Sequence, residues 1–458
     1  MTDPLSFWAR VKGNVLHREV DLASLAALRI LFGLLLAAGQ LRFLTSGWVR
    51  TQFVAPRFFF KFYGFEWVQP WSEPLLYLHV GVLIALALCL AAGFFHRVAA
   101  ALFAVGFAYL QLLDVTNYLN HYYFVVLLAG LFAFLPASGL WSVDAWRNPS
   151  LRRERAPGWM LSLVRFQVAV VYVNAGLAKA TSDWLIHAQP LGIWLGARTE
   201  TPLIGPLLAQ SWAPHAFAWA GFLFDTTIVG FLLWKKARPF AYAVVLVFHA
   251  LTHLFFNIGM FPFIMVVAAT VMFDPSWPRR WLRSTPPALP TAAKPLSRWA
   301  ALLLGAFCLF QVLFPLRHFV YPGDVLWNEE GMRFSWKVMV REKNGSVTFH
   351  VTDPHSGRRF QVSPSQYLLP RQANEMSSQP DLILQLAHHI AADFRERGFA
   401  DVEVRAEAWV SLNGRPPALL IDPTVDLAKE RDGLGPKHWT LPAPVTPPVR
   451  AALVAKAR

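Results

Sequence analysis

The chain has 458 residues, of which 55% are hydrophobic and only 15% are charged. Soluble globular proteins carry about 25% charged residues, so this composition, with 37 Phe and 19 Trp, excludes an ordinary soluble or disordered chain. The mean hydropathy of +0.38 indicates a polytopic membrane protein. A formal net charge of +14 is typical of basic cytoplasmic loops, so we do not expect nucleic acid as a partner. The two cysteines lie in apolar runs, which excludes a disulfide framework.

Nine apolar runs have the length of membrane-spanning helices, which need about 20 mostly apolar residues. They are 22–41, 75–95, 98–114, 121–137, 158–178, 214–234, 239–256, 259–273 and 299–316. We divide the stretch 240–273 at Asn257-Ile258-Gly259, because one helix of about 34 residues would overshoot the hydrocarbon core. Whether this stretch forms one span or two stays open at this point.

Lys and Arg gather in alternate connections between these runs. We place the N-terminus inside. The outward-facing connections that follow the first one then carry few basic residues other than Lys179 and Arg198. This asymmetry follows the positive-inside rule, and an odd number of spans then places the C-terminal part outside. The inner, basic segments are 1–21, 96–97, 138–157, 235–238 and 274–298.

The first outward connection, 42–74, differs from the others. It carries Arg42, Arg50, Arg57 and Lys61 among many aromatic residues. This mixture suits a helix in the membrane interface or a re-entrant segment. It equally suits an aromatic belt that anchors the fold.

From His318 onward the composition becomes that of a soluble domain. We predict a transmembrane domain over 1–317, an exterior α+β domain over 318–435 and a loose Pro-rich tail over 436–458. The predicted fold class is a polytopic α-helical membrane protein with about nine transmembrane helices, followed by a small exterior α+β domain.

The exterior domain shows the patterns of strands, hairpin turns and one helix. Alternating apolar residues predict the strands, Asn-Gly sequences predict the turns, and an amphipathic period predicts the helix. The strands are 334–340, 346–351 and 402–412, the turns are Lys343-Asn344-Gly345 and Asn413-Gly414, and the helix is 382–397.

Lys179 is the first candidate for function, because ionisable side chains in or beside a span are costly to bury. It follows the fifth predicted span, after the small residues Ala175, Gly176 and Ala178. One interpretation is a lysine that snorkels to the membrane interface. The other is a desolvated lysine whose neutral amine acts as a base. The small residues allow a second helix or a flat ligand to approach closely.

Three histidines and one carboxylate lie in or beside other spans. His121 opens the fourth span and, taken alone, is typical of an interfacial histidine. His249 and His253 stand four residues apart on one helix face, but no third ligand is evident, so we do not expect a metal. Asp225 lies within the sixth span, where we expect a hydrogen-bonded or paired contact between helices.

The predicted topology brings several of these side chains together. Arg42 ends the first span, His121 begins the fourth, Lys179 ends the fifth, and His249 and His253 lie in the outer part of the seventh. All approach the outer half of the bilayer. A basic, aromatic-walled pocket there is suited to a lipid-soluble ring compound and a water-soluble partner.

Several short motifs follow one another along nearly the whole chain. They are Arg29-Ile30-Leu31-Phe32-Gly33-Leu34-Leu35, Asn120-His121, Leu140-Trp141-Ser142-Val143-Asp144, Ala175-Gly176-Leu177-Ala178-Lys179 with Asp183-Trp184, Phe248-His249, Phe256-Asn257-Ile258-Gly259-Met260-Phe261, Phe334-Ser335-Trp336 with Met339-Val340, Trp409-Val410-Ser411-Leu412-Asn413, and Asp422-Pro423 with Val425-Asp426. In this order they resemble the vitamin K-dependent γ-glutamyl carboxylase family, including its shorter bacterial relatives with the same transmembrane (HTTM) domain.

The resemblance implies an O2-dependent epoxidation of a naphthoquinol coupled to γ-carboxylation of peptide glutamate. A lysine deprotonates the quinol, the oxygenated quinol generates a strong base, and the carbanion made at glutamate captures CO2. No side chain at pH 7 is basic enough to remove the γ-proton of glutamate, so the strong base must form in a dry pocket. The implied co-substrates are reduced vitamin K or a menaquinol-like naphthoquinol, O2 and CO2, without a metal. The implied partners are the lipid membrane and a Glu-containing peptide or protein.

The matched positions also imply roles for individual residues. Lys179 is the initiating base, and His121 with Asn120 hydrogen-bonds the developing anion. His249 lines the quinone pocket, and Arg42 offers its charge to a carboxylate or oxyanion.

The chain departs from the family at Ala178, where a lysine often precedes the catalytic one, and its exterior region is shorter than that of the animal enzymes. Quinol epoxidation or oxidation without peptide carboxylation is therefore one alternative function. A non-catalytic membrane scaffold or transporter of the same fold is another. The topology predicts a bacterial inner membrane with the exterior domain in the periplasm, or, in a eukaryote, the endoplasmic reticulum membrane with a lumenal domain.

Overall fold

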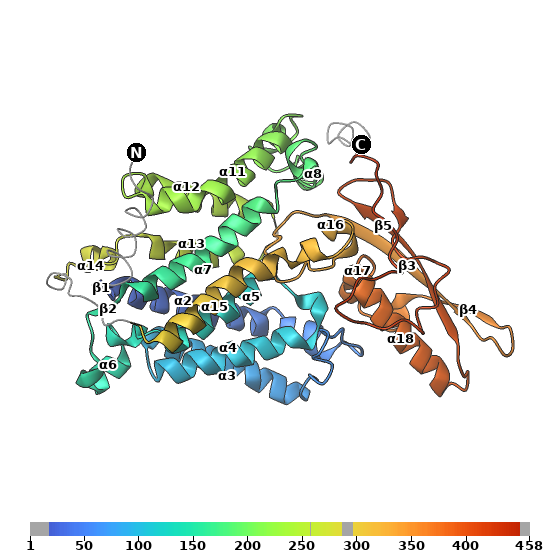
Figure 1. The fold of residues 1–458 in the computed structure, drawn as a ribbon, viewed down its shortest axis with the longest axis horizontal. Helices are drawn as coiled ribbons and strands as arrows, with labels where there is room; N and C mark the ends of the chain where they lie inside the picture. The colour runs from blue at the N-terminus through green and yellow to red at the C-terminus, as the bar shows by residue number, and fades with distance from the viewer. Residues whose placement is uncertain (1–17, 257, 286–295, 449–458) are drawn as a thin grey trace.

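The computed structural model describes residues 18–256, 258–285 and 296–448. A bundle of apolar helices forms one part of the molecule, and a smaller α+β domain packs against one end of it (Figure 1). The described residues thus have the predicted class, a helical membrane domain followed by an α+β domain.

Within the described residues, seven helices are long and apolar enough to cross a membrane. They are α2 (Ala23–Thr45), α3 (Glu73–Ala92), α4 (His96–Leu113), α7 (Gly158–Leu177), α11 (Ala213–Leu233), α12 (Arg238–Phe255) and α15 (Arg298–Leu313), which continues as a 3₁₀-helix, Phe314–Val320. Two further apolar helices are shorter, α5 (Asn120–Phe134) and α13 (Phe261–Ala269), the latter extended by a 3₁₀ turn, Thr270–Met272.

These helices fall on the nine predicted runs, but the count of nine spans is not confirmed. Helix α5 has 15 residues and α13 has nine, which is short of a full bilayer crossing. The stretch 240–273 does divide into two helices between Phe255 and Phe261. Gly259 has a φ of 59° at this break, while Asn257 lies outside the described residues.

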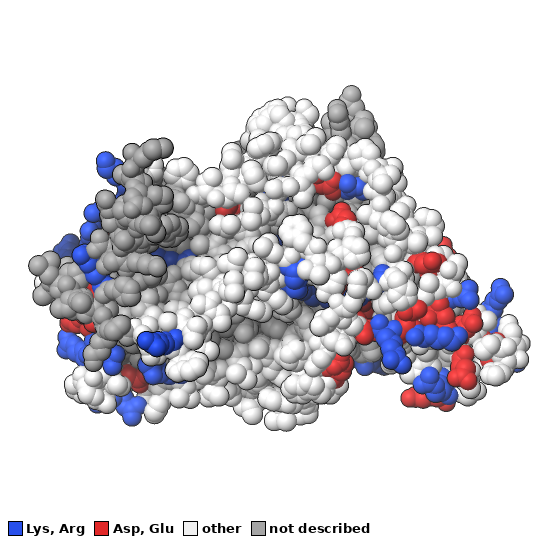
Figure 2. Space-filling model, viewed as in Figure 1, with Lys and Arg blue, Asp and Glu red and all other residues white. Residues whose placement is uncertain are grey.

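Basic side chains gather at the end of the bundle opposite the α+β domain. Figure 2 shows few charges along the middle of the bundle and a mixture of both signs on the α+β domain. At the basic end, β1 (Glu19–Asp21) pairs with β2 (Arg155–Pro157), and the Arg279 guanidinium contacts the Asp21 carboxylate at 2.7 Å. This distribution is that of an integral membrane protein with one basic face. The short helices α6 (Val143–Arg147) and α14 (Trp277–Trp281) lie at the same end.

Glycine allows the closest helix contacts in the bundle. A Cβ added at Gly33 of α2 would lie 2.6 Å from the Ala91 backbone nitrogen of α3. A Cβ added at Gly176 of α7 would lie 2.6 Å from the Thr226 methyl group of α11. Because lipid tails are as apolar as the side chains, such close packing is a main source of association between membrane helices.

The α+β domain is built on a four-stranded antiparallel sheet in the order β4-β3-β5-β6. Alternate residues of β5 are buried, as a sheet with one covered face requires, and α18 packs on that sheet. The strands are β3 (Lys343–Thr352), β4 (Arg359–Val362), β5 (Glu403–Leu412) and β6 (Ala418–Leu419), and the main helices are α17 (Pro370–Met376) and α18 (Pro380–Glu396).

The sequence predictions for this domain are partly confirmed. The helix 382–397 and the strand 402–412 correspond to α18 and β5, and β5 forms a hairpin with β6 after Asn413-Gly414. The turn predicted at Lys343-Asn344-Gly345 is wrong, because these residues begin β3. Gly345 is required there for close packing, since its Cβ would lie 2.6 Å from the Ser377 carbonyl oxygen.

The strand predicted over 334–340 is also wrong. We call residues 333–340 the strap, because they form an irregular segment that crosses the end of the bundle. Phe334, Trp336 and Met339 have positive φ values of 61°, 57° and 54°, which no strand accommodates. Phe334 and Trp336 pack on Tyr123 of the bundle instead of in a sheet, and Trp336 is fully buried there.

The connection 42–74 contains no interfacial helix beyond one short π-helical turn, Arg50–Val54, among the described residues. It joins the two domains. The Lys61 backbone nitrogen donates to the Gln385 side chain of α18 at 2.9 Å, and the Phe58 and His389 rings are 4.6 Å apart. Aromatic residues of this connection therefore dock the α+β domain.

The predicted tail is not loose throughout. Its first described part packs on the α+β domain, where Trp439 is buried and the Leu441 nitrogen donates to the Leu420 carbonyl oxygen at 2.8 Å. Residues 449–458 lie outside the described part of the chain. The division into 1–317, 318–435 and 436–458 stays a prediction.

A buried ion pair fixes the hairpin of the α+β domain to the bundle. Asp183, in the short helix α8 (Ser182–Leu185), accepts hydrogen bonds from both terminal nitrogens of Arg415 at 2.6 and 2.7 Å and from the Asn413 amide at 2.9 Å. Burial raises the pKa of the Asp183 carboxyl, but hydrogen bonds from Arg415 and Asn413 outweigh burial and hold this pKa below its usual 3.8.

We expect Asp183→Asn to lower the melting temperature of the detergent-solubilised protein at pH 7 and to speed hydrogen exchange in the β5–β6 hairpin. The substitution leaves Arg415 buried without its charge partner, at a cost of about 3 kcal/mol. A lowered carboxyl pKa stabilises the fold above the unfolded pKa and not below the folded one, so the difference between wild type and variant shrinks as pH falls below 3.8. Glu396→Gln, which removes an exposed carboxylate, is the control. Equal melting temperatures at pH 7 would contradict the role of this pair.

Candidate functional site: two chambers beneath the exterior domain

Lys179 lies just beyond the end of α7, and its side chain is buried. Its Nζ is 2.8 Å from the Asp225 Oδ2 of α11, 3.1 Å from the Ala175 carbonyl oxygen and 3.4 Å from the Val338 carbonyl oxygen of the strap. The Trp184 ring lies 5.3 Å from the same nitrogen. The snorkelling interpretation is therefore wrong, and the predicted pairing of Asp225 across helices is confirmed.

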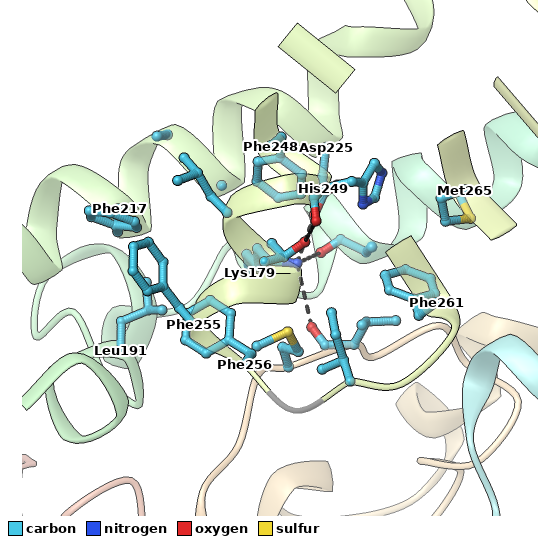
Figure 3. A pocket seen from close by; sticks show the side chains of 18 of the residues that line it. Lys179, Leu191, Phe217, Asp225, Phe248, His249, Phe255, Phe256, Phe261 and Met265 are labelled. Atoms are coloured by element: carbon cyan, nitrogen blue, oxygen red, sulfur yellow. Dashed lines mark hydrogen bonds and ion pairs between the residues drawn. The ribbon is translucent and has the colours of Figure 1, made fainter. Parts of the chain in front are cut away.

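A cavity of about 300 Å³ opens beside Lys179, and we call it the apolar chamber. Figure 3 shows Lys179 at its centre, with Phe217, Phe255 and Phe256 on one side and His249 and Phe261 on the other. Helices α7, α11, α12 and α13 supply most of the wall, and the residues that line it include Lys179, Asp225 and His249. Ligand sites of this kind are mostly apolar with a few convergent polar groups.

His249 is buried in the wall of the apolar chamber. Its Nε2 lies 3.1 Å from the Tyr172 hydroxyl of α7, and its Nδ1 has no hydrogen-bond partner among the described residues. His253 does not join it, because its side chain is exposed and its ring lies 5.0 Å from the Phe263 ring. The two histidines therefore do not converge. Within the described ranges, no cluster of three or more His, Cys, Asp or Glu side chains is placed to hold a metal ion.

A second cavity of about 440 Å³, the basic chamber, lies against the first. The described residues that line it include Arg42, Asn120, His121, Lys337 and Arg371, and no carboxylate. The Asn120 amide donates to the Lys337 carbonyl oxygen at 3.4 Å and accepts from the Tyr118 hydroxyl at 2.9 Å. The structure thus brings the predicted residues Arg42, Asn120 and His121 together here.

The two chambers share part of their walls. Ile258, Phe261, Val338 and Met339 line both cavities, so the strap and the start of α13 separate Lys179 from the basic chamber. His121 of the basic chamber and His249 of the apolar chamber both contact this wall, with ring centres 5.9 and 6.0 Å from that of Phe261. The predicted site residues therefore lie in two adjoining cavities, one apolar and one basic.

Lys337 and Arg371 are basic residues of the site that the sequence did not reveal. Lys337 lies in the strap that was predicted to be a strand, and Arg371 begins a helix of the exterior domain with no unusual pattern around it. The Arg371 guanidinium donates to the Asn117 side chain and stacks 4.8 Å from the centre of the Trp48 ring. Burial lowers the pKa of Lys337, and the charge of Asp324 opposes this effect. A bound anion would offset the energetic cost of burying these two positive charges.

Two family models match the chain. The HTTM domain matches residues 17–277, and the lumenal domain of vitamin K-dependent gamma-carboxylase matches residues 296–446. The chain belongs to the gamma-carboxylase-like family with an HTTM domain. Together the two matches cover both the bundle and the α+β domain, so the suspected resemblance is confirmed. No solved structure matches the chain.

Gly176 allows α7 and α11 to approach closely enough for Lys179 to meet Asp225. We expect Gly176→Val to lower the melting temperature, because the added atoms collide with Thr226 and overpacking costs about 1–3 kcal/mol. Gly230→Val, on the open side of α11, is the matched control, since its Cβ meets no atom within 4 Å. Similar melting temperatures for the two variants would contradict the close contact.

Proposed function

We propose that this gamma-carboxylase-like membrane protein oxidises a naphthoquinol to its epoxide with O2 and uses that reaction to carboxylate peptide glutamate. The observation that carries the proposal is the buried Lys179 amine in an apolar cavity that adjoins a basic one. The apolar chamber suits the ring of a quinol such as reduced vitamin K or menaquinol. The basic chamber suits the carboxylate of the second substrate.

A lipid-soluble ring compound has a path into the apolar chamber. Ala216 and Ala220 of α11 and Leu251 of α12 line the cavity and are also exposed on the outer surface of the bundle. The chamber therefore opens between these helices on the side that faces lipid. Its wall of Phe side chains excludes water, which strengthens every electrostatic interaction inside.

In this proposal Lys179 is the base that removes the proton of the quinol hydroxyl. The N–H bond forms at Nζ, the O–H bond of the quinol breaks, and the electron pair remains on the quinol oxygen. His249 lines the ring site with its unpartnered Nδ1 available to the ligand. His121 and Asn120, across the shared wall, hydrogen-bond the anion that develops during oxygenation.

The carboxylation half of the proposal rests on Arg42. It lies in the basic chamber with His121, Lys337 and Arg371, and its Nε is buried without a hydrogen-bond partner among the described residues. Guanidinium groups bind carboxylates through two parallel hydrogen bonds. We propose that this chamber receives the glutamate side chain from the side of the exterior domain, in a bacterial inner membrane with that domain in the periplasm.

We expect the purified wild type, supplied with vitamin K hydroquinone and O2, to form epoxide and to fix labelled CO2 into a Glu-rich peptide. Lys179→Ala removes the base and is expected to abolish both products, while Lys429→Ala, an exposed lysine, leaves them unchanged. The epoxide is measured by chromatography and the label by scintillation counting. Epoxide without fixed CO2 would reduce the function to quinol epoxidation, and the absence of both in wild type would contradict the proposal.

We expect Arg42→Gln to separate the two reactions. Loss of a charge-assisted hydrogen bond costs about 1.5–3 kcal/mol, so the KM for the peptide rises about tenfold or more, while epoxide formation at saturating quinol changes less than about threefold. Arg50→Gln, at an exposed position of the same connection, is the control. An equal loss of epoxide and fixed CO2 in Arg42→Gln would place this arginine in the quinol step instead.

A further inference from the structure

The surroundings of Lys179 match an ammonium group in number and direction. An ammonium has three donors and no acceptor. Its three acceptors here are the Asp225 carboxylate at 2.8 Å and the carbonyl oxygens of Ala175 and Val338 at 3.1 and 3.4 Å. The site is therefore arranged for the protonated form of the lysine, which is the product of the base step and not its starting state.

Asp225 supplies the only negative charge of this arrangement. It is the one acidic residue among the described residues that line the apolar chamber, and its side chain is 8% exposed. In the described part of the chain, Lys179 is the one side chain that donates a hydrogen bond to it. Asp225 lies in the middle of α11, where it caps no helix end, and among the described residues Lys179 is the one cation paired with it. Burying a carboxylate at this position is costly, so its presence indicates a function in the pair.

We propose that Asp225 is the positioning and charge-balancing residue of Lys179. Its carboxylate fixes Nζ at the chamber wall and stabilises the ammonium that forms when the amine takes the quinol proton. This inference rests on the proposed function, since it concerns the base of the same reaction. It adds a residue that neither the motifs of the sequence nor the family matches assign to the site.

Charge conservation in the cavity gives the physical reason. With Asp225 present, the amine and carboxylate together carry one negative charge before proton transfer and none after it. The negative charge moves to the quinol oxygen, and the number of charges without a partner does not increase. Without the carboxylate, the same transfer creates a new cation and a new anion inside an apolar cavity, where isolated charges are strongly disfavoured.

The first test is the turnover of Asp225→Asn. The amide keeps the size of the side chain but cannot balance the ammonium, so we expect kcat for epoxide formation to fall about 100-fold while the quinol KM changes less than about threefold. Without the carboxylate we expect the Lys179 amine to be less basic and therefore neutral at a lower pH, so the rise of activity with pH moves to lower pH. The same change makes the amine a weaker base, which is why turnover slows. Asp225→Glu retains the charge and restores part of kcat. Asp21→Asn, at a buried ion pair of the opposite end, is the matched control.

The second test does not require turnover. 1-Fluoro-2,4-dinitrobenzene is small and uncharged and reacts with an amine only in its neutral form, and its adduct on Lys179 is quantified by mass spectrometry. In Asp225→Asn we expect Lys179 to be labelled at a pH at least one unit lower than in wild type. A general distortion of the pocket would slow turnover without this change. Slower turnover together with labelling at lower pH is therefore the expected result.

The outcomes separate the two proposals. Wild-type epoxide with full activity and an unchanged pH profile in Asp225→Asn would overturn the role of Asp225 and leave the quinol reaction intact. Absence of epoxide in wild type would overturn the proposed function, and the labelling experiment would still decide the role of Asp225. Identical labelling of Lys179 in wild type and Asp225→Asn at every pH would overturn the inference in either case.

Discussion

The burial of one lysine among apolar helices constrains much of the surrounding structure. A lone ammonium in this position is strongly disfavoured, so the fold must supply a carboxylate and carbonyl acceptors at hydrogen-bonding distance. Gly176 allows α11 to come close enough to α7 for Asp225 to reach Lys179. The strap supplies the Val338 carbonyl oxygen from the exterior side. Three parts of the chain, two helices and the strap, thus meet at a single nitrogen atom.

The strap also connects the exterior domain to the bundle by direct packing. Its Trp336 is fully buried against the bundle, and its backbone forms part of the wall between the apolar and basic chambers. The exterior domain is therefore a component of the site and not an independent module. The ion pair of Asp183 with Arg415 and the hydrogen bond from Trp194 to Glu342 at 2.7 Å hold the same interface beside the chambers. The apolar and basic chambers are then separated by only a few side chains.

Much of this fold could be predicted from hydrophobic length and charge asymmetry. These patterns locate the helices, because a bilayer crossing needs a run of apolar residues and basic residues remain on one side. Length favoured a break near Gly259 but left open whether the stretch 240–273 forms one span or two. The count of full crossings could not be predicted, because α5 and α13 are shorter helices flanked by apolar irregular segments. Hydropathy does not distinguish such apolar irregular segments from helix.

The candidate site could be predicted in its individual residues but not in its arrangement. Lys179 and Asp225 were each conspicuous as charges in apolar surroundings, yet their pairing depends on the contact between α7 and α11. The strap was predicted to be a strand because Phe334 and Trp336 alternate with polar residues. Their side chains pack against the bundle instead, and this packing depends on tertiary contacts that the local pattern does not reveal. Lys337 and Arg371 had no signal of their own, since basic residues are common in soluble domains.

The most direct measurement is to map where a naphthoquinone binds. A photoreactive naphthoquinone, incubated with the protein in lipid nanodiscs and illuminated, is expected to attach to residues of the apolar chamber such as Phe217, Phe248 and Phe255. Excess menaquinone should compete with it, and Ala220→Trp, which fills the chamber from the lipid side, should block it. Attachment spread over the lipid-facing surfaces of α3 and α15, unaffected by competitor or by Ala220→Trp, would contradict a quinol site beside Lys179.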